Sequence, residues 1–208
     1  MIGHVGHPAR SITVGRVSGS ISQTAASAVP ADAADRPVPH PDAPSPGTPL
    51  DQHYAHCFGC GDLEHGLRMR FVAGEDLSLT GTFTVAPEHQ GAPGLAHGGL
   101  LTTAFDEALG ALQVFFREPA VTAELSTRFR RPVPVGSTLY LAARVDRKEG
   151  RKLWVSATGR LDAPDGPLAA ESSALFLVVP IEHFVRHGRA QEVAAAGLPA
   201  GQYREVNP

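Results

Sequence analysis

The chain lacks several features that would assign it to a large class of proteins. None of its apolar runs reaches the roughly 20 residues that a membrane-spanning helix needs, and its N-terminus has no apolar signal-peptide core. Two cysteines among 208 residues are too few for a disulfide scaffold. A formal charge of −3 gives no general basic surface for nucleic acid or an anionic membrane. We therefore expect a cytoplasmic protein with no nucleic-acid partner and no membrane partner.

Aromatic residues are absent from residues 1–50, which hold 8 of the 18 prolines. Such a segment cannot bury enough apolar surface to offset the entropy of ordering it. Its arginines and aspartates balance in number, so it is not an electrostatic arm. We predict a disordered tail over 1–50, a folded domain over 51–184 and a loose tail, rich in Ala and Gly, over 185–208.

Hydrophobic patterning in the middle of the chain predicts strands around one helix. Apolar residues recur at helical spacing from Leu100 to Phe116 and cover most of the helix circumference, which is typical of a buried helix. The predicted strands are 67–72, 77–85, 121–129, 138–146, 153–161 and 168–179. One long helix among hairpin-linked strands indicates an α+β fold, with an antiparallel β-sheet wrapped around a central helix.

The run Gly94-Leu95-Ala96-His97-Gly98-Gly99 leads directly into this helix. A glycine turn that opens a buried helix offers unpaired N–H groups and the positive end of the helix dipole, which suit an oxyanion. Asp106 lies on the polar ridge of the helix, whereas Glu107 points about 100° away from it. A carboxylate on a mostly buried helix is costly unless it is paired or used. Acyl-transfer chemistry is one interpretation, and a structural acid that bonds a neighbouring strand is the other.

Helix geometry separates the two parts of this candidate site. Gly98 and Asp106 are about 12 Å apart along a helix that rises 1.5 Å per residue. An oxyanion donor and a catalytic carboxylate must each come within about 3 Å of one reacting group. We therefore predict a composite site, in which the glycine turn of one subunit faces Asp106 of another across a two-fold axis.

Five short motifs follow one another along the chain. They are His97-Gly98-Gly99, Asp106-Glu107, Val121-Thr122-Ala123, the segment 130–136 (RRPVPVG) and Glu149-Gly150-Arg151-Lys152. Over about residues 55–180 this series resembles the hotdog-fold acyl-CoA thioesterases of the phenylacetate-pathway and thioesterase-superfamily-member type. The resemblance implies a hotdog fold, a homodimer or dimer of dimers, and hydrolysis of an acyl-CoA to free acid and CoA. CoA is then part of the substrate, and no cofactor is implied.

The resemblance also implies roles for four residues. Asp106 matches the catalytic carboxylate, acting either as general base on water or as a nucleophile that forms a mixed anhydride. Gly98 matches the backbone N–H that polarises the thioester carbonyl. Thr122 matches the hydroxyl that positions water or the carboxylate, and an ordinary strand threonine is the alternative. His97 is similar to the turn histidine, which is structural or positions substrate, and a buried histidine with satisfied hydrogen bonds is the alternative.

A second group of residues is implied to bind substrate. It consists of Gln90, Gly91, Gly99, Arg128, Arg130, Arg151 and Lys152. Arg128 and Arg130 share one face of a strand, and arginine forks suit the phosphates of CoA. Solvated turn charge is the alternative for the basic residues. Some relatives carry an asparagine where this chain has Gly91, so either Gln90 supplies the amide or the oxyanion contact rests on the backbone alone.

The two cysteines form a CxxC motif, Cys57-Phe58-Gly59-Cys60-Gly61, which has the spacing of half a zinc site. His53, His56 and His65 lie nearby in the sequence. A second CxxC is absent, and the three histidines leave a metal site as the alternative. The resemblance implies the cap of a hairpin, because related thioesterases carry a similar Cys-rich turn before the first strand, and we therefore predict no metal. A redox role is disfavoured because no βαβ pattern surrounds the pair.

Two other functions fit a hotdog fold. One is a non-catalytic module that binds acyl-CoA or another hydrophobic ligand, and such a module has no need of Asp106 on the buried helix. The other is a dehydratase, which would pair a catalytic histidine with its acid in a different arrangement. The spacing of His97 and Asp106 fits the thioesterase type better.

Overall fold

The computed structural model describes residues 37–196, which belong to one compact unit. Most of the predicted N-terminal tail, residues 1–36, and the end of the predicted C-terminal tail, residues 197–208, lie outside the described residues.

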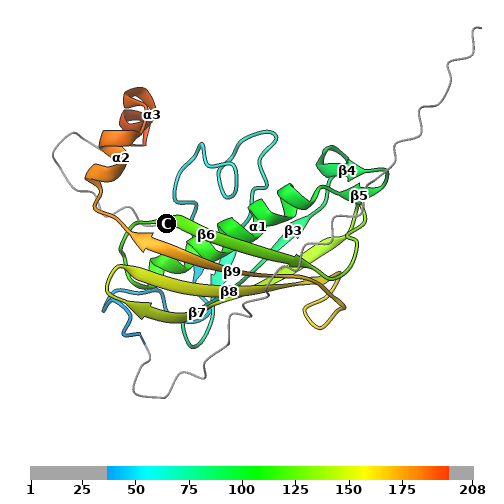
Figure 1. Cartoon of the computed structure of the whole chain (residues 1–208), viewed down its shortest axis with the longest axis horizontal. Coiled ribbons are helices and arrows are strands. Elements are labelled where there is room, and N and C mark those ends of the chain that lie inside the picture. The colour runs from blue at the N-terminus through cyan, green and yellow to red at the C-terminus, as the bar shows by residue number, and fades with distance from the viewer. Residues whose placement is uncertain (1–36, 197–208) are drawn as a thin grey trace, which may run out of the picture. The chain divides into compact units, whose positions relative to one another are not determined.

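The main element is a seven-stranded sheet with the order β1-β2-β3-β7-β8-β9-β6, in which every neighbouring pair is antiparallel (Figure 1). Its strands are β1 (Pro49–Leu50), β2 (Phe71–Ala73), β3 (Ser78–Thr84), β6 (Ala120–Phe129), β7 (Thr138–Glu149), β8 (Lys152–Leu161) and β9 (Leu168–Val178). Buried and less buried residues alternate along β8 and β9, as expected for a sheet with one face on the core. The predicted antiparallel sheet is confirmed.

One helix, α1 (Gly98–Gly110), packs across this sheet and continues as a 3₁₀ turn, η3 (Ala111–Phe115) (Figure 1). It contacts β3 and the four long strands β6 to β9. Five of its residues are buried, namely Leu101, Ala104, Phe105, Ala108 and Leu109. Gly159 in β8 leaves room for the helix, because an added Cβ would lie 3.0 Å from Phe105 Cζ. The predicted α+β architecture, with one central helix against one sheet, is therefore confirmed.

The helix begins two residues earlier than the apolar pattern predicts. His97 is its N-cap, and its Nδ1 accepts the Gly99 N–H at 2.9 Å. This bond satisfies one of the amides that a helix N-terminus leaves unpaired. Glycine has low intrinsic helix propensity, so the pattern alone placed the start at Leu100 and missed the contribution of the cap.

The folded part extends N-terminal to residue 51. The His40 N–H donates to the Phe115 carbonyl at 2.8 Å, and Pro49 and Leu50 pair with Val72 and Phe71 at the edge of the sheet. The described part of the predicted N-terminal tail is thus held by long-range backbone bonds, which composition does not predict.

Two short helices, α2 (Glu182–His187) and α3 (Ala190–Ala195), follow β9. The described part of the predicted C-terminal tail is therefore partly helical, although neither helix contains a buried residue. Among residues 37–196, no helix combines the length and apolar character needed to cross a bilayer.

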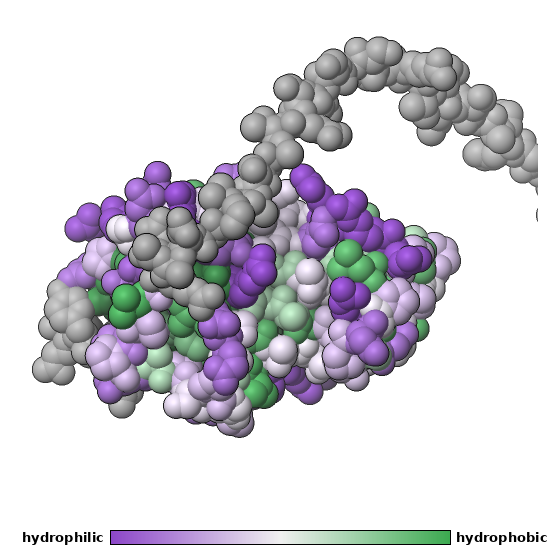
Figure 2. Space-filling model, turned by 90° about the horizontal axis from the view of Figure 1, so that it is seen from below, coloured by the Kyte–Doolittle hydropathy of each residue, from purple (hydrophilic) through white to green (hydrophobic). Residues whose placement is uncertain are grey.

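The surface mixes polar and apolar residues. On the face seen in Figure 2, apolar residues occupy several separate areas among polar ones. Large apolar side chains that stay exposed, such as Val38, Phe58 and Phe129, lie on different segments of the described chain. Scattered exposure of this kind is ordinary for a folded protein, but the Phe129 ring lies against Gly98 at the N-terminus of α1.

Candidate active site

Asp106 on α1 reaches across to β6. Its Oδ1 accepts a hydrogen bond from Thr122 Oγ1 at 2.9 Å. Asp106 is half-buried and Thr122 is exposed, so the carboxylate is held on one side while staying accessible. A hydroxyl that donates to one carboxylate oxygen fixes the rotamer and leaves the second oxygen free to accept a proton. The structure thus brings together two of the four residues predicted as catalytic.

Gln113 fixes the register of this contact. Its Nε2 donates to the Gly110 carbonyl at 2.8 Å, and its Oε1 accepts the Ala120 N–H at 2.6 Å. The end of α1 is thereby tied to the first residue of β6, near Thr122. Beside Asp106 lies a pocket of about 210 Å³, whose lining includes Asp106, Gln113 and Phe176.

The N-terminus of α1 forms a second, separate feature. The Gly99 N–H is bonded to His97 Nδ1, and the amides of Leu100 and Leu101 donate to the His97 carbonyl. This leaves the Gly98 N–H without an acceptor among the described residues. A free amide at the positive end of a helix can stabilise an oxyanion.

An open groove of about 600 Å³ lies at this helix N-terminus, and its lining includes Gly98, Phe129, Arg130 and Arg131. Phe129 approaches the turn so closely that a Cβ on Gly98 would be 3.3 Å from its ring. Gly98 and Asp106 therefore line different hollows, as the predicted separation along one helix requires. The His97 ring is exposed, so its described role is to cap the helix rather than to fill the core.

The loop before the helix uses Gln90 within itself. The Gln90 Nε2 donates to the Pro87 carbonyl at 2.8 Å, and its Oε1 accepts the Gly94 N–H at 2.8 Å, which closes the turn between β4 (Gln90–Ala92) and β5 (Leu95–Ala96). Gly91 is required by packing, because an added Cβ would lie 2.7 Å from His97 Cα. A substrate contact from either residue stays a prediction, and the local geometry already accounts for both.

The four predicted phosphate-binding residues are not brought together within the chain. Arg128 and Arg130 lie at the C-terminal end of β6, where Arg130 pairs with the Glu171 carboxylate. Arg151 and Lys152 lie at the turn between β7 and β8. This turn is near the opposite end of β6, about 26 Å away at 3.3 Å per residue, since Val121 and Lys152 both pair with Leu177.

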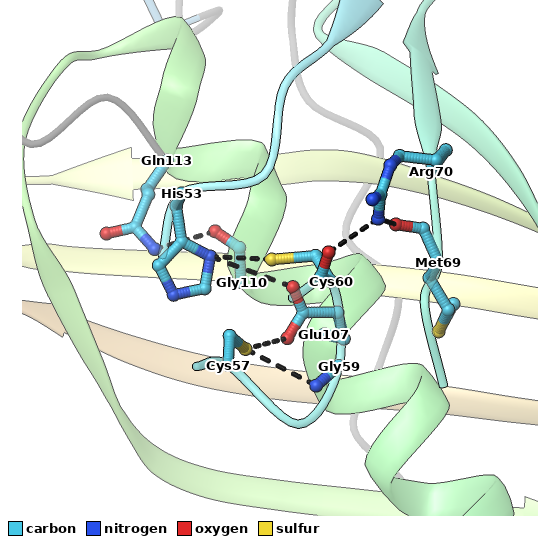
Figure 3. A network of polar contacts seen from close by, with 9 residues as sticks. All are labelled: His53, Cys57, Gly59, Cys60, Met69, Arg70, Glu107, Gly110 and Gln113. Carbon is cyan, nitrogen blue, oxygen red and sulfur yellow. Dashed lines mark hydrogen bonds and ion pairs between the residues drawn. The ribbon is translucent and has the colours of Figure 1, made fainter. Parts of the chain in front are cut away.

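The cysteine loop packs on Glu107, a contact that the sequence interpretation missed (Figure 3). The Cys57 thiol lies 3.4 Å from Glu107 Oε2, and Cys60 Sγ lies 3.0 Å from His53 Nδ1. The Glu107 side chain is only 14% exposed. The position of Glu107 next to Asp106 on a mostly apolar helix could have indicated that it is paired. Its partners could not be identified from the sequence, because they lie in a loop far from it along the chain.

Burial and mutual hydrogen bonding shift the proton affinities of this cluster. Burial raises the pKa of Glu107 to about 7. The hydrogen bond from the Cys60 thiol lowers the pKa of Cys57, and the pKa of Cys60 rises because that thiol is the donor. The hydrogen bond with Cys57 raises the pKa of His53. Cys57 therefore loses its proton more readily than an isolated thiol, whereas Cys60, Glu107 and His53 each hold a proton more tightly than isolated groups of the same types.

Gly59 is required by the close approach of Glu107. A Cβ at this position would lie 2.1 Å from Glu107 Oε2, so Gly59→Ala must displace the carboxylate or the loop. We expect this change to lower the free energy of unfolding by about 1–3 kcal/mol. Gly110→Ala is the matched control, because its Cβ would meet Phe176 at an ordinary 3.5 Å. Urea unfolding of both variants provides the measurement, and equal midpoints would contradict the steric argument.

Comparison with known families places similarity in the same region of the chain. Residues 93–164 match the model of the thioesterase superfamily. The chain is 38% identical over 118 residues to the acyl-coenzyme A thioesterase THEM4 of Bos taurus, a match that covers 55% of this chain and 48% of that protein. It is 33% identical over 100 residues to the acyl-coenzyme A thioesterase THEM5 of Mus musculus, covering 48% and 40%. The chain thus spans about half the length, or less, of these two curated relatives.

Solved structures have a similar fold. A crystal structure of a thioesterase-superfamily protein superposes with a TM-score of 0.55 at 27% identity, covering 65% of this chain and 70% of that chain. The Escherichia coli PaaI protein from the phenylacetic acid degradation operon superposes with a TM-score of 0.51 at 18% identity, covering 55% and 81%. The second likeness concerns the fold alone. The hotdog arrangement of sheet and helix is therefore confirmed.

Proposed function

We propose that the chain hydrolyses an acyl-CoA thioester to the free acid and CoA, because residues 93–164 match the model of the thioesterase superfamily. The observation that carries the proposal is the half-buried Asp106 carboxylate, oriented by the Thr122 hydroxyl at 2.9 Å beside a pocket. A carboxylate in that position can act on a bound thioester, whereas a purely binding surface has no use for one.

Two routes start from this carboxylate. As general base, Asp106 takes a proton from water while the water oxygen bonds to the thioester carbonyl carbon, and the C–S bond then breaks to release CoA. As nucleophile, Asp106 forms a mixed anhydride and expels CoA before water hydrolyses the anhydride. Both routes place a negative charge on the carbonyl oxygen. The free Gly98 N–H supports that charge in either case.

We propose that the site is completed by a second copy of the chain. β6 is an edge strand of the sheet, and an exposed edge can pair with an identical edge about a two-fold axis. Antiparallel pairing about the middle of β6 would bring its Thr122 end onto the Phe129 end of the partner strand. The first end carries Asp106 and the second lies against Gly98. The oligomer would be a homodimer or a dimer of dimers.

The same pairing offers a role for the separated basic residues. Arg151 and Lys152 lie at the Thr122 end of β6, and Arg128 and Arg130 lie at the other end. Across the two-fold axis, one pair from each subunit would border the same site. Either pair could then contact the phosphates of CoA.

The test of the proposed function is CoA release from short, medium, long and aryl acyl-CoAs, followed with a thiol-reactive dye. Turnover of at least one substrate class supports the hydrolase, and the preferred class identifies the acyl group. Tight binding of acyl-CoA by calorimetry with no turnover of any substrate would instead support a non-catalytic binding module.

Thr122→Val tests the hydroxyl that orients the carboxylate. Valine suits a strand but cannot donate to Asp106 Oδ1, so we expect kcat to fall roughly 10- to 100-fold, the equivalent of the about 1.5–3 kcal/mol of a hydrogen bond to a charged group. Thr122→Ser keeps the donor and should stay close to wild type. Equal rates for the valine and serine variants would show that the hydroxyl has no part in turnover.

A further inference from the structure

Four side chains with metal-ligating atoms converge beside α1. They are His53, Cys57, Cys60 and Glu107, and one ligand atom from each lies within 4.8 Å of all the others. Three come from the loop before β2 and the fourth from the helix (Figure 3). The proposed hydrolysis uses none of them, so this cluster needs its own explanation.

The spacing of these atoms approaches that of a tetrahedron around one ion. Bonds of about 2.3 Å to sulfur and about 2.0–2.1 Å to nitrogen or oxygen give tetrahedral edges of about 3.3–3.8 Å. Three of the observed separations are 3.0 Å from Cys60 Sγ to His53 Nδ1, 3.4 Å from Cys57 Sγ to Glu107 Oε2, and 3.8 Å from His53 Nδ1 to Glu107 Oε1, and the others are at most 4.8 Å. Coordination through one Glu107 oxygen therefore requires shifts of up to about 1 Å from the tetrahedral edges.

The loop backbone is built to hold the two sulfurs. The Gly59 N–H donates to Cys57 Sγ at 3.3 Å, and the Gly61 N–H donates to the Cys57 carbonyl at 2.9 Å. A Cβ on Gly61 would lie 2.4 Å from the Ala55 carbonyl oxygen, so the turn cannot tolerate a side chain there. Amide donors to sulfur stabilise a thiolate, as outer-shell bonds do in metal sites.

A second set of contacts anchors this loop to the segment that leads into β2. The Leu67 N–H donates to the Phe58 carbonyl at 2.8 Å, and the Met69 N–H donates to the Gly59 carbonyl at 2.9 Å. The Arg70 guanidinium donates to the carbonyls of Cys60 and Met69 (Figure 3). The loop is thus positioned by many backbone bonds.

The charge balance of the cluster favours a cation. The groups that act electrostatically on Glu107 are two thiols and an imidazole, none of which carries a permanent positive charge. Cys60 is 4% exposed and Glu107 14% exposed, so ionised forms of both lack full hydration. A divalent cation would neutralise the negative charge of these buried groups when they are ionised.

We propose that the chain binds one Zn²⁺ through His53 Nδ1, the sulfurs of Cys57 and Cys60, and the Glu107 carboxylate. Two sulfurs, one imidazole and one carboxylate in a tetrahedral arrangement suit Zn²⁺, whereas Mg²⁺ and Ca²⁺ prefer oxygen ligands alone. Four protein ligands close the coordination sphere, so the ion is structural. The sequence interpretation of this motif as a metal-free hairpin cap is the hypothesis that this proposal replaces.

The position of the site gives the ion a consequence for Asp106. His53, Cys57, Cys60 and Glu107 all line the pocket of about 210 Å³ that Asp106 also lines. Glu107 directly follows Asp106 in the chain and lies in the last turn of α1. Zn²⁺ would therefore fix the wall of that pocket and pin the loop to the helix at the residue next to the carboxylate.

The test is the zinc content of the full chain, purified without a histidine tag from zinc-supplemented cells and measured by mass spectrometry. We expect about one Zn²⁺ per chain, and less than about 0.2 in Cys60→Ser or Glu107→Gln. His65→Gln is the matched control, because His65 lies in the same loop outside the cluster. It should keep its zinc. Substitution with Co²⁺ should give the visible bands of tetrahedral cobalt and a thiolate charge-transfer band.

A second measurement covers variants that fail to fold. Removal of metal from the wild-type chain with a chelator should lower the Tm, and Zn²⁺ should restore it while Mg²⁺ should not. Two results would overturn the proposal. One is wild-type protein with less than about 0.1 Zn²⁺ per chain and no cobalt bands after reconstitution. The other is equal zinc in the wild type and in Cys60→Ser. Neither depends on thioesterase activity, so the proposed function can fail while the zinc site stands.

Discussion

Replacement of Asp106 by asparagine is expected to abolish CoA release while leaving acyl-CoA binding intact. Asparagine has nearly the shape of aspartate, and its Oδ1 can still accept the Thr122 hydroxyl that now lies 2.9 Å away. The amide cannot take a proton from water and cannot form an anhydride. Loss of a general base costs about 10²- to 10⁴-fold in rate, and loss of a nucleophile costs at least as much. The measurement is kcat with the preferred acyl-CoA, alongside the dissociation constant by calorimetry.

Asp165→Asn is the matched control for this change. Asp165 is exposed on the turn between β8 and β9, so the same chemical substitution there should leave kcat unchanged. The two variants should have the same Tm and the same elution volume as the wild type, which shows that fold and assembly are preserved. A rate for Asp106→Asn above about a tenth of wild type would remove Asp106 from the chemistry, because a general base contributes at least about 100-fold.

The elements that could be predicted from sequence are those whose pattern is local. Apolar residues around most of the helix circumference predicted α1, and alternation predicted the strands β3 and β6 to β9 to within a few residues. β1 could not be predicted, because a strand of two residues exists only through its pairing with Phe71 and Val72. The same holds for residues 37–48, whose backbone bonds reach the end of the helix and β2.

Some contacts of the candidate site could likewise be predicted from the sequence, and others could not. The polar ridge of the helix identified Asp106, and the resemblance paired it with Thr122, a contact that the structure contains. The sequence predicted no site role for Glu107, because helical spacing shows only the direction of a side chain and not which loop covers it. The basic residues were grouped by chemical type. Sheet register then placed Arg130 and Arg151 at opposite ends of one subunit, and spacing along the chain cannot show this.

The two basic pairs lie at opposite ends of β6, and Gly98 and Asp106 are separated in the same way. One end of β6 carries the carboxylate with Thr122, and the other carries the free amide with Phe129 and a groove of about 600 Å³. Neither end is a complete acyl-transfer site. A two-fold axis through β6 would place the carboxylate end of each chain beside the free-amide end of its partner. The dimer would then contain two complete sites, although each chain alone contains none.

Proline at position 98 removes the proposed oxyanion donor without breaking the helix. Gly98 is the first helical residue, where a missing N–H costs no helical hydrogen bond, and His97 before it has φ −69° and ψ 129°, which suits a residue preceding proline. Gly98→Pro is expected to lower kcat about 100-fold or more, as loss of an oxyanion donor does. Gly98→Ala adds the same Cβ against Phe129 but keeps the N–H, and should lose much less.

A heterodimer of Gly98→Pro and Asp106→Asn subunits is then expected to regain activity that neither parent has. The heterodimer can be purified with two different affinity tags. It should show about half the wild-type turnover, because one of its two composite sites combines the intact Gly98 of the Asp106→Asn subunit with the intact Asp106 of the Gly98→Pro subunit. The decisive comparison is a heterodimer of wild-type and doubly substituted subunits. Composite sites make it inactive, since each site then contains one altered residue, whereas sites confined to one subunit make it half active. The two heterodimers contain the same substitutions in the same numbers, so only their distribution between subunits can separate the two rates.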